Sequence, residues 1–289
     1  MTLPSFGRPW SRVVLAVTAL VLTAVGCGTG GDGDVANPRN GAGESLLDGA
    51  EMSLVIVGDS TSYAWPTMLQ EMLDEHSGGE RRHHVLNAVV GGSPVVRWIA
   101  DPESDDYDDT FGAMLRDFFG PEARLRGDAP EPTVALCQQS LQSVGTRRGP
   151  IASTDDAEGI RIGADALEKL AVRLSEHGIE RVYIATDIYE EPAEPEVGNE
   201  RLALSALLDR GHDFVFEGPD LWTPTRDAHP DAYTDDGIYP GQLGMKIMAE
   251  HWYRTVAGAG ARQEVVDRLY TTDYDIETLM TDYLNGRRP

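Results

Sequence analysis

Apolar and polar positions change their spacing repeatedly from residue 51 to the C-terminus. Short apolar runs rich in β-branched residues predict strands over 52–57, 84–90, 133–137, 181–186 and 213–216. Apolar residues at helical spacing predict helices over 65–76, 111–119, 160–174, 197–210 and 243–256, and a helical tail over 262–284 that breaks near Thr271. Strands that alternate with helices form right-handed crossovers and a parallel sheet. We therefore expect an α/β domain over 51–289, built as a three-layer, flavodoxin-like parallel sheet with helices on both faces.

The first 27 residues have the pattern of an export signal. Arg8 and Arg12 precede an apolar run over 13–25 that is too short for a comfortable membrane span, and small residues follow it. Residues 24–27 (AVGC) resemble a bacterial lipobox, which predicts lipidation of Cys27 and a protein anchored to the membrane outside the cytoplasm. An ordinary cleaved signal with an incidental cysteine is the alternative. Residues 28–50, rich in Gly, Asp, Asn and Ala, predict a flexible linker.

Charge and motif content exclude several classes of function. The formal net charge of -24 would repel nucleic acid, so we expect no nucleic-acid partner. The sequence has no Walker A pattern, no Gly-x-Gly-x-x-Gly and no paired Cys or His at zinc spacing, so we expect no cofactor and no metal. The acidic run 101–109 could hold calcium but lacks EF-hand spacing, and a solvated loop is the alternative. Cys137 lies in an apolar run and is expected to be a buried core residue.

A serine follows the first predicted strand in a turn suited to catalysis. Ligand sites of parallel sheets form beyond the carboxyl ends of the strands. The first strand ends in Gly58-Asp59-Ser60, where a small residue permits a tight turn that presents the serine hydroxyl above the sheet. Here the sequence resembles the SGNH/GDSL hydrolase family, whose first conserved block is this serine turn. The resemblance implies that Ser60 is a nucleophile.

The resemblance extends over nearly the whole domain and implies further site residues. Residues 87–92 (NAVVGG) look like the second block, in which the amide of Gly92 would help to form an oxyanion hole. The third block normally supplies an asparagine; Gln142 falls closest to that position, with Gln138 and Gln139 as competitors. The last block, 235–249, places Asp236 as the orienting acid, but Tyr239 stands where the family has its catalytic histidine.

The missing histidine leaves two hypotheses about function open. A tyrosine with an ordinary pKa near 10 is a poor base, and loss of the base removes roughly four to six orders of magnitude of rate. His229, oriented by Asp227 or Asp236, could replace it, although a solvent-exposed loop histidine is the competing interpretation.

The leading hypothesis is an SGNH-type serine esterase that acts on an acylated small molecule, carbohydrate or lipid at the cell envelope or outside the cell. The alternative is a catalytically degenerate lipoprotein of the same fold that binds such a ligand. A tethered surface protein that contacts partners through its acidic face is the third possibility.

Overall fold

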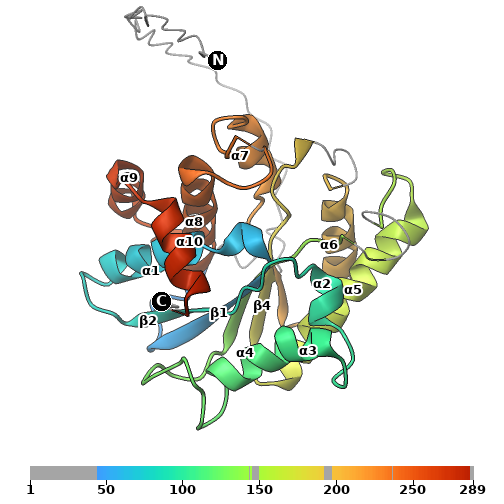
Figure 1. The fold of residues 1–289 in the computed structure, drawn as a ribbon, viewed down its shortest axis with the longest axis horizontal. Coiled ribbons are helices and arrows are strands. Elements are labelled where there is room, and N and C mark those ends of the chain that lie inside the picture. The colour runs from blue at the N-terminus through green and yellow to red at the C-terminus, as the bar shows by residue number, and fades with distance from the viewer. Residues whose placement is uncertain (1–43, 143, 145–149, 192–196, 236, 287–289) are drawn as a thin grey trace, which may run out of the picture. The chain divides into compact units, whose positions relative to one another are not determined.

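Five parallel strands form the centre of the molecule in the computed structural model, which describes residues 44–142, 144, 150–191, 197–235 and 237–286. The strand order is β2-β1-β3-β4-β5, with β1 at Met52–Gly58, β2 at His83–Asn87, β3 at Val134–Gln138, β4 at Arg181–Ile184 and β5 at Val215–Glu217 (Figure 1). This order is that of flavodoxin-like sheets. The predicted fold class is confirmed.

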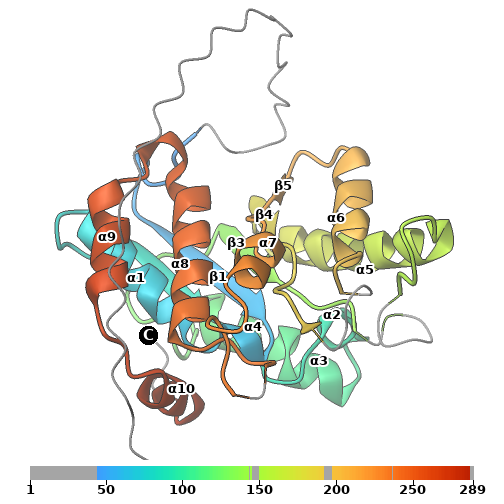
Figure 2. The same cartoon turned by 90° about the horizontal axis from the view of Figure 1, so that it is seen from above.

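Helices cover both faces of the sheet, so that the domain has three layers (Figure 2). One face packs against α1 (Trp65–His76) and α8 (Gln242–Ala257), with α7 (Trp222–Asp227), α9 (Gln263–Thr271) and α10 (Ile276–Leu284) beside them. The other face packs against α2 (Val95–Trp98), α3 (Asp105–Asp109), α4 (Phe111–Phe118), α5 (Ala157–Glu176) and α6 (Glu200–Asp209). Short 3-10 turns follow β1 and α8 as η1 (Ser60–Ser62) and η3 (Gly258–Gly260).

The strands are apolar on both faces because both faces are covered. Leu54 and Ile56 of β1 belong to the core under α1 and α8, whereas Val55 and Val57 belong to the core under α4 and α5. Near-continuous apolar runs are what buried parallel strands require. Cys137 of β3 is fully buried in the second of these cores, as expected for a small apolar residue, and burial raises the pKa of its thiol.

The predicted elements differ from the structure in their lengths and in three short helices. The second strand ends at Asn87 rather than Val90, and the side chain of Asn87 accepts a hydrogen bond from the backbone N–H of Val89 at 3.1 Å. Helices α2, α3 and α7 were not predicted.

The acidic run is partly helical rather than wholly a loop. Helix α3 begins after Ser104, whose Oγ accepts a hydrogen bond from the N–H of Tyr107. Its first turn carries Asp105, Asp106 and Asp108, whose negative charges interact favourably with the positive end of the helix dipole. Among the described residues, no group of three acidic, His or Cys side chains has the arrangement of a metal site.

The packed domain begins before residue 51, which corrects the boundary of the predicted linker. Leu46 and Leu47 are buried in the core under α8, and the N–H of Leu46 donates to the carbonyl of Val256 at 2.9 Å. Burial of two leucine side chains stabilises the folded state, so this part of the chain belongs to the domain and not to a solvated linker. The export signal, Cys27 and the earlier part of the linker lie outside the described residues. In the described part of the chain, no helix has the length and apolar character needed to cross a membrane.

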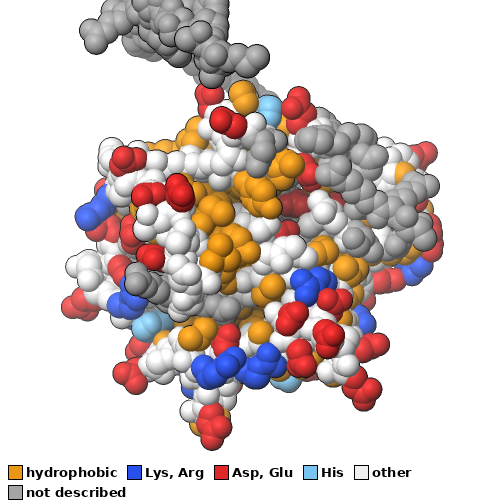
Figure 3. Space-filling view, in the orientation of Figure 1, with side chains coloured by type: hydrophobic (Ala, Val, Ile, Leu, Met, Phe, Trp, Pro, Cys, Tyr) orange, Lys and Arg blue, Asp and Glu red, His pale blue; other side chains and the backbone are white. Residues whose placement is uncertain are grey.

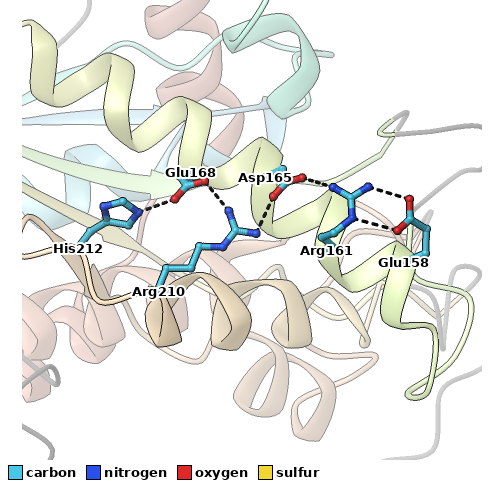
Figure 4. A network of polar contacts seen from close by, with 6 residues as sticks. All are labelled: Glu158, Arg161, Asp165, Glu168, Arg210 and His212. Carbon is cyan, nitrogen blue, oxygen red and sulfur yellow. Dashed lines mark hydrogen bonds and ion pairs between the residues drawn. The ribbon is translucent and has the colours of Figure 1, made fainter.

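A chain of ion pairs joins α5 to the end of α6 (Figure 4). Arg210 contacts Asp165 at 2.6 Å and also Glu168, while Arg161 contacts Asp165 and Glu158 within α5. His212 contacts Glu168 on the same face, and this hydrogen bond is the main reason that the pKa of Glu168 is lowered. The network links α5 to the C-terminal end of α6, and the first residue of α6, Glu200, lies at the opposite end of that helix.

Candidate functional site

The turn after β1 holds Ser60 through the hydrogen bonds of its neighbours. Asp59 begins the 3-10 turn η1, and its Oδ1 accepts the N–H of Thr61 at 2.9 Å and the hydroxyl of Thr61 at 2.8 Å. The amide of Gln138, at the end of β3, donates to the same hydroxyl at 3.0 Å. A side chain on Gly58 would lie 3.0 Å from the carbonyl oxygen of Gln138. The glycine therefore lets β1 and β3 stay close where the serine turn begins.

A cavity of about 550 Å³ opens at the carboxyl ends of the strands. It brings together Ser60, Gly92, Gln142 and Tyr239, four of the residues that the sequence singled out. They come from four separate segments of the chain, as expected when several strands end at one edge of a parallel sheet. Their proximity is a property of the structure, whereas their chemical roles remain predictions.

The three candidate glutamines occupy different places. Gln142 lines the cavity, and its amide nitrogen lies 3.4 Å from Oε2 of Glu190. Gln138 is buried beneath the serine turn, where it donates to Thr61. Gln139 is buried beside a second, much smaller cavity, and its amide has no hydrogen-bond partner among the described residues. Of the three, only Gln142 is placed to contact a ligand in the larger cavity.

The glycine pair after β2 allows a close approach of backbone to the serine turn. A Cβ on Gly91 would lie 1.9 Å from the hydroxyl of Tyr63, so no larger residue fits there without displacing that ring. Gly92 has a φ of +66°, which favours glycine, and it lines the cavity. The Tyr63 ring packs against Tyr283 of α10 at 5.1 Å, and the Tyr283 hydroxyl donates to the carbonyl of Val89. Helix α10 thus supports the loop that carries Gly92.

Tyr239 reaches the cavity from a tight turn between α7 and α8. The N–H of Thr234 donates to the carbonyl of Tyr239 at 2.9 Å, and Gly237 has a φ of +69°. The Tyr239 side chain is 39% exposed and lies at the rim. The predicted orienting acid, Asp236, lies outside the described residues.

His229, the predicted substitute base, is not among the residues that line the cavity. Its ring packs against Tyr189 and Tyr233 at 5.3 and 5.5 Å, and its Nε2 lies 3.8 Å from Oε2 of Glu191. The ring is therefore neither at the serine nor fully exposed. None of the described residues that line the cavity is a histidine.

Carboxyl groups from separate segments gather at the wall of the cavity (Asp59 and Asp187) and behind it (Glu200). Asp187 follows β4, and burial together with the charge of Asp59 raises its pKa to about 8. Burial also raises the pKa of Asp59, although its hydrogen bonds with Thr61 oppose the shift. Glu200, the first residue of α6, is 5% exposed, and burial followed by the charge of Asp187 raises its pKa well above the ordinary value. Burial and the mutual repulsion of their negative charges favour the protonated form of these carboxyl groups.

Sequence reasoning missed Asp187 and Glu200. Asp187 directly follows the predicted strand 181–186, so the rule that ligands bind beyond strand ends could have found it. Glu200 gives no such signal, because it opens a helix and is held by the backbone N–H of Leu141, which donates to its Oε2 at 3.0 Å. That contact depends on tertiary structure.

Several solved structures, two of them esterases by name, are similar to the chain at low sequence identity. TesA has 15% identity over 75% of this chain and 99% of its own, with a TM-score of 0.43. The psychrotrophic esterase EstA from Pseudoalteromonas sp. has 13% identity over 71% of this chain and 96% of its own, with a TM-score of 0.45. A carbohydrate esterase family 3 protein from Talaromyces cellulolyticus has 11% identity over 77% of this chain and 100% of its own, also with a TM-score of 0.45. No protein-family model and no curated protein matches the sequence.

Proposed function

We propose that this protein is an SGNH-type, esterase-like hydrolase with a weakened proton-transfer apparatus. One observation carries the proposal: Ser60, Gly92, Gln142 and Tyr239, which the family resemblance assigns to one site, line a single cavity. The cavity is large enough for a small acyl ester.

The proposed reaction is acyl transfer through the serine. The Ser60 oxygen attacks the ester carbonyl, its proton passes to an acceptor, and the backbone of Gly92 with the amide of Gln142 stabilises the oxyanion. Collapse of the tetrahedral intermediate releases the alcohol, which takes up the proton, and water then hydrolyses the acyl-serine. The described side chains at the cavity that can accept this proton are carboxylates. Because none is an imidazole, we expect slow turnover.

Labelling with a fluorophosphonate tests whether the serine is reactive. We expect the wild type to be labelled and the Ser60→Ala variant to lose the label. Ser175→Ala is the matched control, because Ser175 lies near the C-terminal end of α5 and donates to the carbonyl of Val172. Equal labelling of wild type and Ser60→Ala would contradict the proposal.

The second candidate function is a binding protein that does not turn its ligand over. The presence of Tyr239, rather than histidine, at the cavity favours this candidate. It predicts that acyl esters bind without release of alcohol and that wild type is not labelled. Release of alcohol by wild type, abolished by Ser60→Ala, would exclude it.

Export and lipid anchoring complete the proposal. Residues 24–27 and the preceding apolar run support attachment through Cys27 to a membrane outside the cytoplasm. An acylated substrate at the cell envelope would then be within reach.

A further inference from the structure

The last described helix of the chain, α10, lies beside a cluster of hydrophobic side chains. On the face shown in Figure 3, these side chains gather near the middle, next to α10, and most acidic side chains lie around them. Ile276, Leu279 and Met280 of α10 pack against the core under α1 and α8. Apolar contacts of this kind hold the helix on the domain.

Polar contacts with α8 hold the residues that lead into α10. The side chain of Gln242, the first residue of α8, donates to Oδ1 of Asp273 at 2.9 Å and to the carbonyl oxygen of Tyr274 at 3.0 Å. One turn later, the buried ammonium group of Lys246 donates to the carbonyl oxygen of Thr272 at 2.6 Å. These contacts fix the start of α10 relative to α8.

Tyr283 joins the other end of α10 to the loop after β2. Of the residues that the structure describes in α10, Tyr283 alone is buried, with 6% of its surface exposed. Its hydroxyl donates a hydrogen bond to the buried carbonyl oxygen of Val89, two residues before the glycine pair Gly91-Gly92. A buried carbonyl that loses its donor destabilises the conformation that buries it. The hydroxyl of Tyr283 therefore stabilises this conformation of the loop.

Tyr63 makes a matching contact from the serine turn. It directly follows η1, which begins at Ser60, and its ring packs against that of Tyr283 with 5.1 Å between the ring centroids. A Cβ on Gly91 would lie 1.9 Å from the Tyr63 hydroxyl. Burial raises the pKa of the Tyr63 phenol, and a backbone hydrogen bond from Gly91 opposes that rise. The phenol therefore contacts the backbone of the glycine pair.

The backbone of the glycine pair lies between two hydrogen bonds to neighbouring segments. On one side, the N–H of Val90 donates to the carbonyl oxygen of Gly58 at 3.1 Å. On the other side, the N–H of Val95 donates to the carbonyl oxygen of Ser140 at 3.0 Å. Two adjacent glycines between these points have wide conformational freedom. Contacts with side chains are therefore needed to fix the direction of the Gly92 N–H.

We propose that Tyr283 and Tyr63 are positioning residues for the oxyanion hole, because together they fix the backbone that presents the Gly92 amide to the cavity. The inference rests on the proposed function, which assigns the oxyanion to that amide. Neither tyrosine is among the described residues that line the cavity, so each acts through the loop and not on the substrate. A displaced donor stabilises the oxyanion less, since the effect depends on alignment.

The rate at which a fluorophosphonate labels Ser60 in the full-length protein tests the inference, because the phosphonyl oxygen takes the place of the ester carbonyl oxygen. Tyr283→Phe keeps the ring and removes the hydroxyl. We expect it to lower the maximal labelling rate by at least about 10-fold and to leave the half-saturating concentration of the probe nearly unchanged. Tyr270→Phe is the matched control, because the Tyr270 hydroxyl bonds with Glu250 away from the cavity. A wild-type labelling rate in Tyr283→Phe would overturn the inference.

Hydrogen exchange of peptides that cover residues 88–92 measures the loop itself. We expect these amides to exchange faster in Tyr283→Phe than in wild type, while the amides of β3 and β4 exchange as before. Unchanged exchange of the loop would overturn the inference. If Tyr283→Phe raised exchange throughout the domain, Tyr63→Phe would replace it, and a wild-type labelling rate in Tyr63→Phe would then overturn the inference.

A double variant tests whether the two tyrosines act on the same loop. We expect the variant with both Tyr63→Phe and Tyr283→Phe to be labelled little more slowly than the slower single variant, because residues in contact are not independent. A decrease equal to the product of the two single effects would overturn their shared action.

The two measurements separate this inference from the proposed hydrolase. Equal labelling of wild type and Tyr283→Phe would support the hydrolase and overturn the positioning role. Absence of label on wild type would overturn the hydrolase, and the exchange of residues 88–92 in Tyr283→Phe would then support or overturn the hold of Tyr283 on the loop.

Discussion

Ionisation of Asp187 lowers the free energy of unfolding by an amount that depends on pH. Its raised pKa means that the folded protein holds a proton that the unfolded chain has lost between about pH 4 and pH 8, so stability falls as pH rises through this window. Asp187→Asn removes the ionisable group. We expect the variant to gain roughly 1–2 kcal/mol over wild type between about pH 5 and pH 8, after allowing for water in the cavity.

Urea unfolding at several pH values measures this effect, with Asp128→Asn as the control that should follow wild type. If the free energies of unfolding of Asp187→Asn and wild type differed by the same amount at every pH in this window, Asp187 would ionise normally in the folded protein.

A substitution at Tyr239 tests the proposal that the site lacks its catalytic base. Tyr239→His places an imidazole at the rim of the cavity that Ser60 lines, and general base catalysis contributes about 10²–10⁴ in rate. We expect a gain of at least about 100-fold in the hydrolysis of p-nitrophenyl acetate. Tyr239→Phe, which adds no base, should give no gain. Equal rates for the histidine and phenylalanine variants would show that residue 239 is not positioned to serve Ser60.

The sequence was informative about site residues that follow strands or match a family block. The placement of Ser60 and Gly92 at the cavity could be predicted because each comes shortly after a predicted strand, in a turn that contains glycine. The position of His229 could not, because its packing against Tyr189 and Tyr233 depends on how the loops after β4 and α7 meet.

At the scale of elements, the ion pairs between α5 and α6 offer a direct comparison. Arg210 contacts two acids of another helix, whereas Arg161 contacts acids of its own helix. We expect Arg210→Ala to lower the free energy of unfolding by about 1 kcal/mol and Arg161→Ala to lower it less. Urea unfolding at low and high salt measures both. A larger effect at Arg161 would contradict the role assigned to the Arg210 link.

Long helices were predictable because their apolar positions repeat at helical spacing over several turns. Helix α5 repeats its apolar positions at Leu167, Leu170 and Leu174 over several turns. Helix α2 spans Val95–Trp98 and is too short to show a period. It ends where Arg173 of α5 donates to the carbonyl of Trp98 at 2.9 Å, a contact that joins residues far apart in the sequence. Such helices are fixed by tertiary contacts rather than by local pattern.

At the scale of the whole molecule, the proposed membrane location depends on one thiol, that of Cys27. We expect Cys27→Ser to move the protein from the membrane fraction to the soluble fraction, because a lipid chain can no longer be attached. Fractionation of cells that produce each variant measures this, with Cys137→Ser as the control for loss of a cysteine. Continued membrane association of Cys27→Ser would exclude lipidation at that residue.

The central claim concerns a reactive hydroxyl in the cavity at the carboxyl edge of the sheet. Peptide mass spectrometry after treatment with a fluorophosphonate identifies the residue that carries the phosphonyl group. The account predicts a single modified site at Ser60, with modification prevented by an acyl ester that occupies the cavity. Modification of another residue, or none after prolonged treatment, would contradict it.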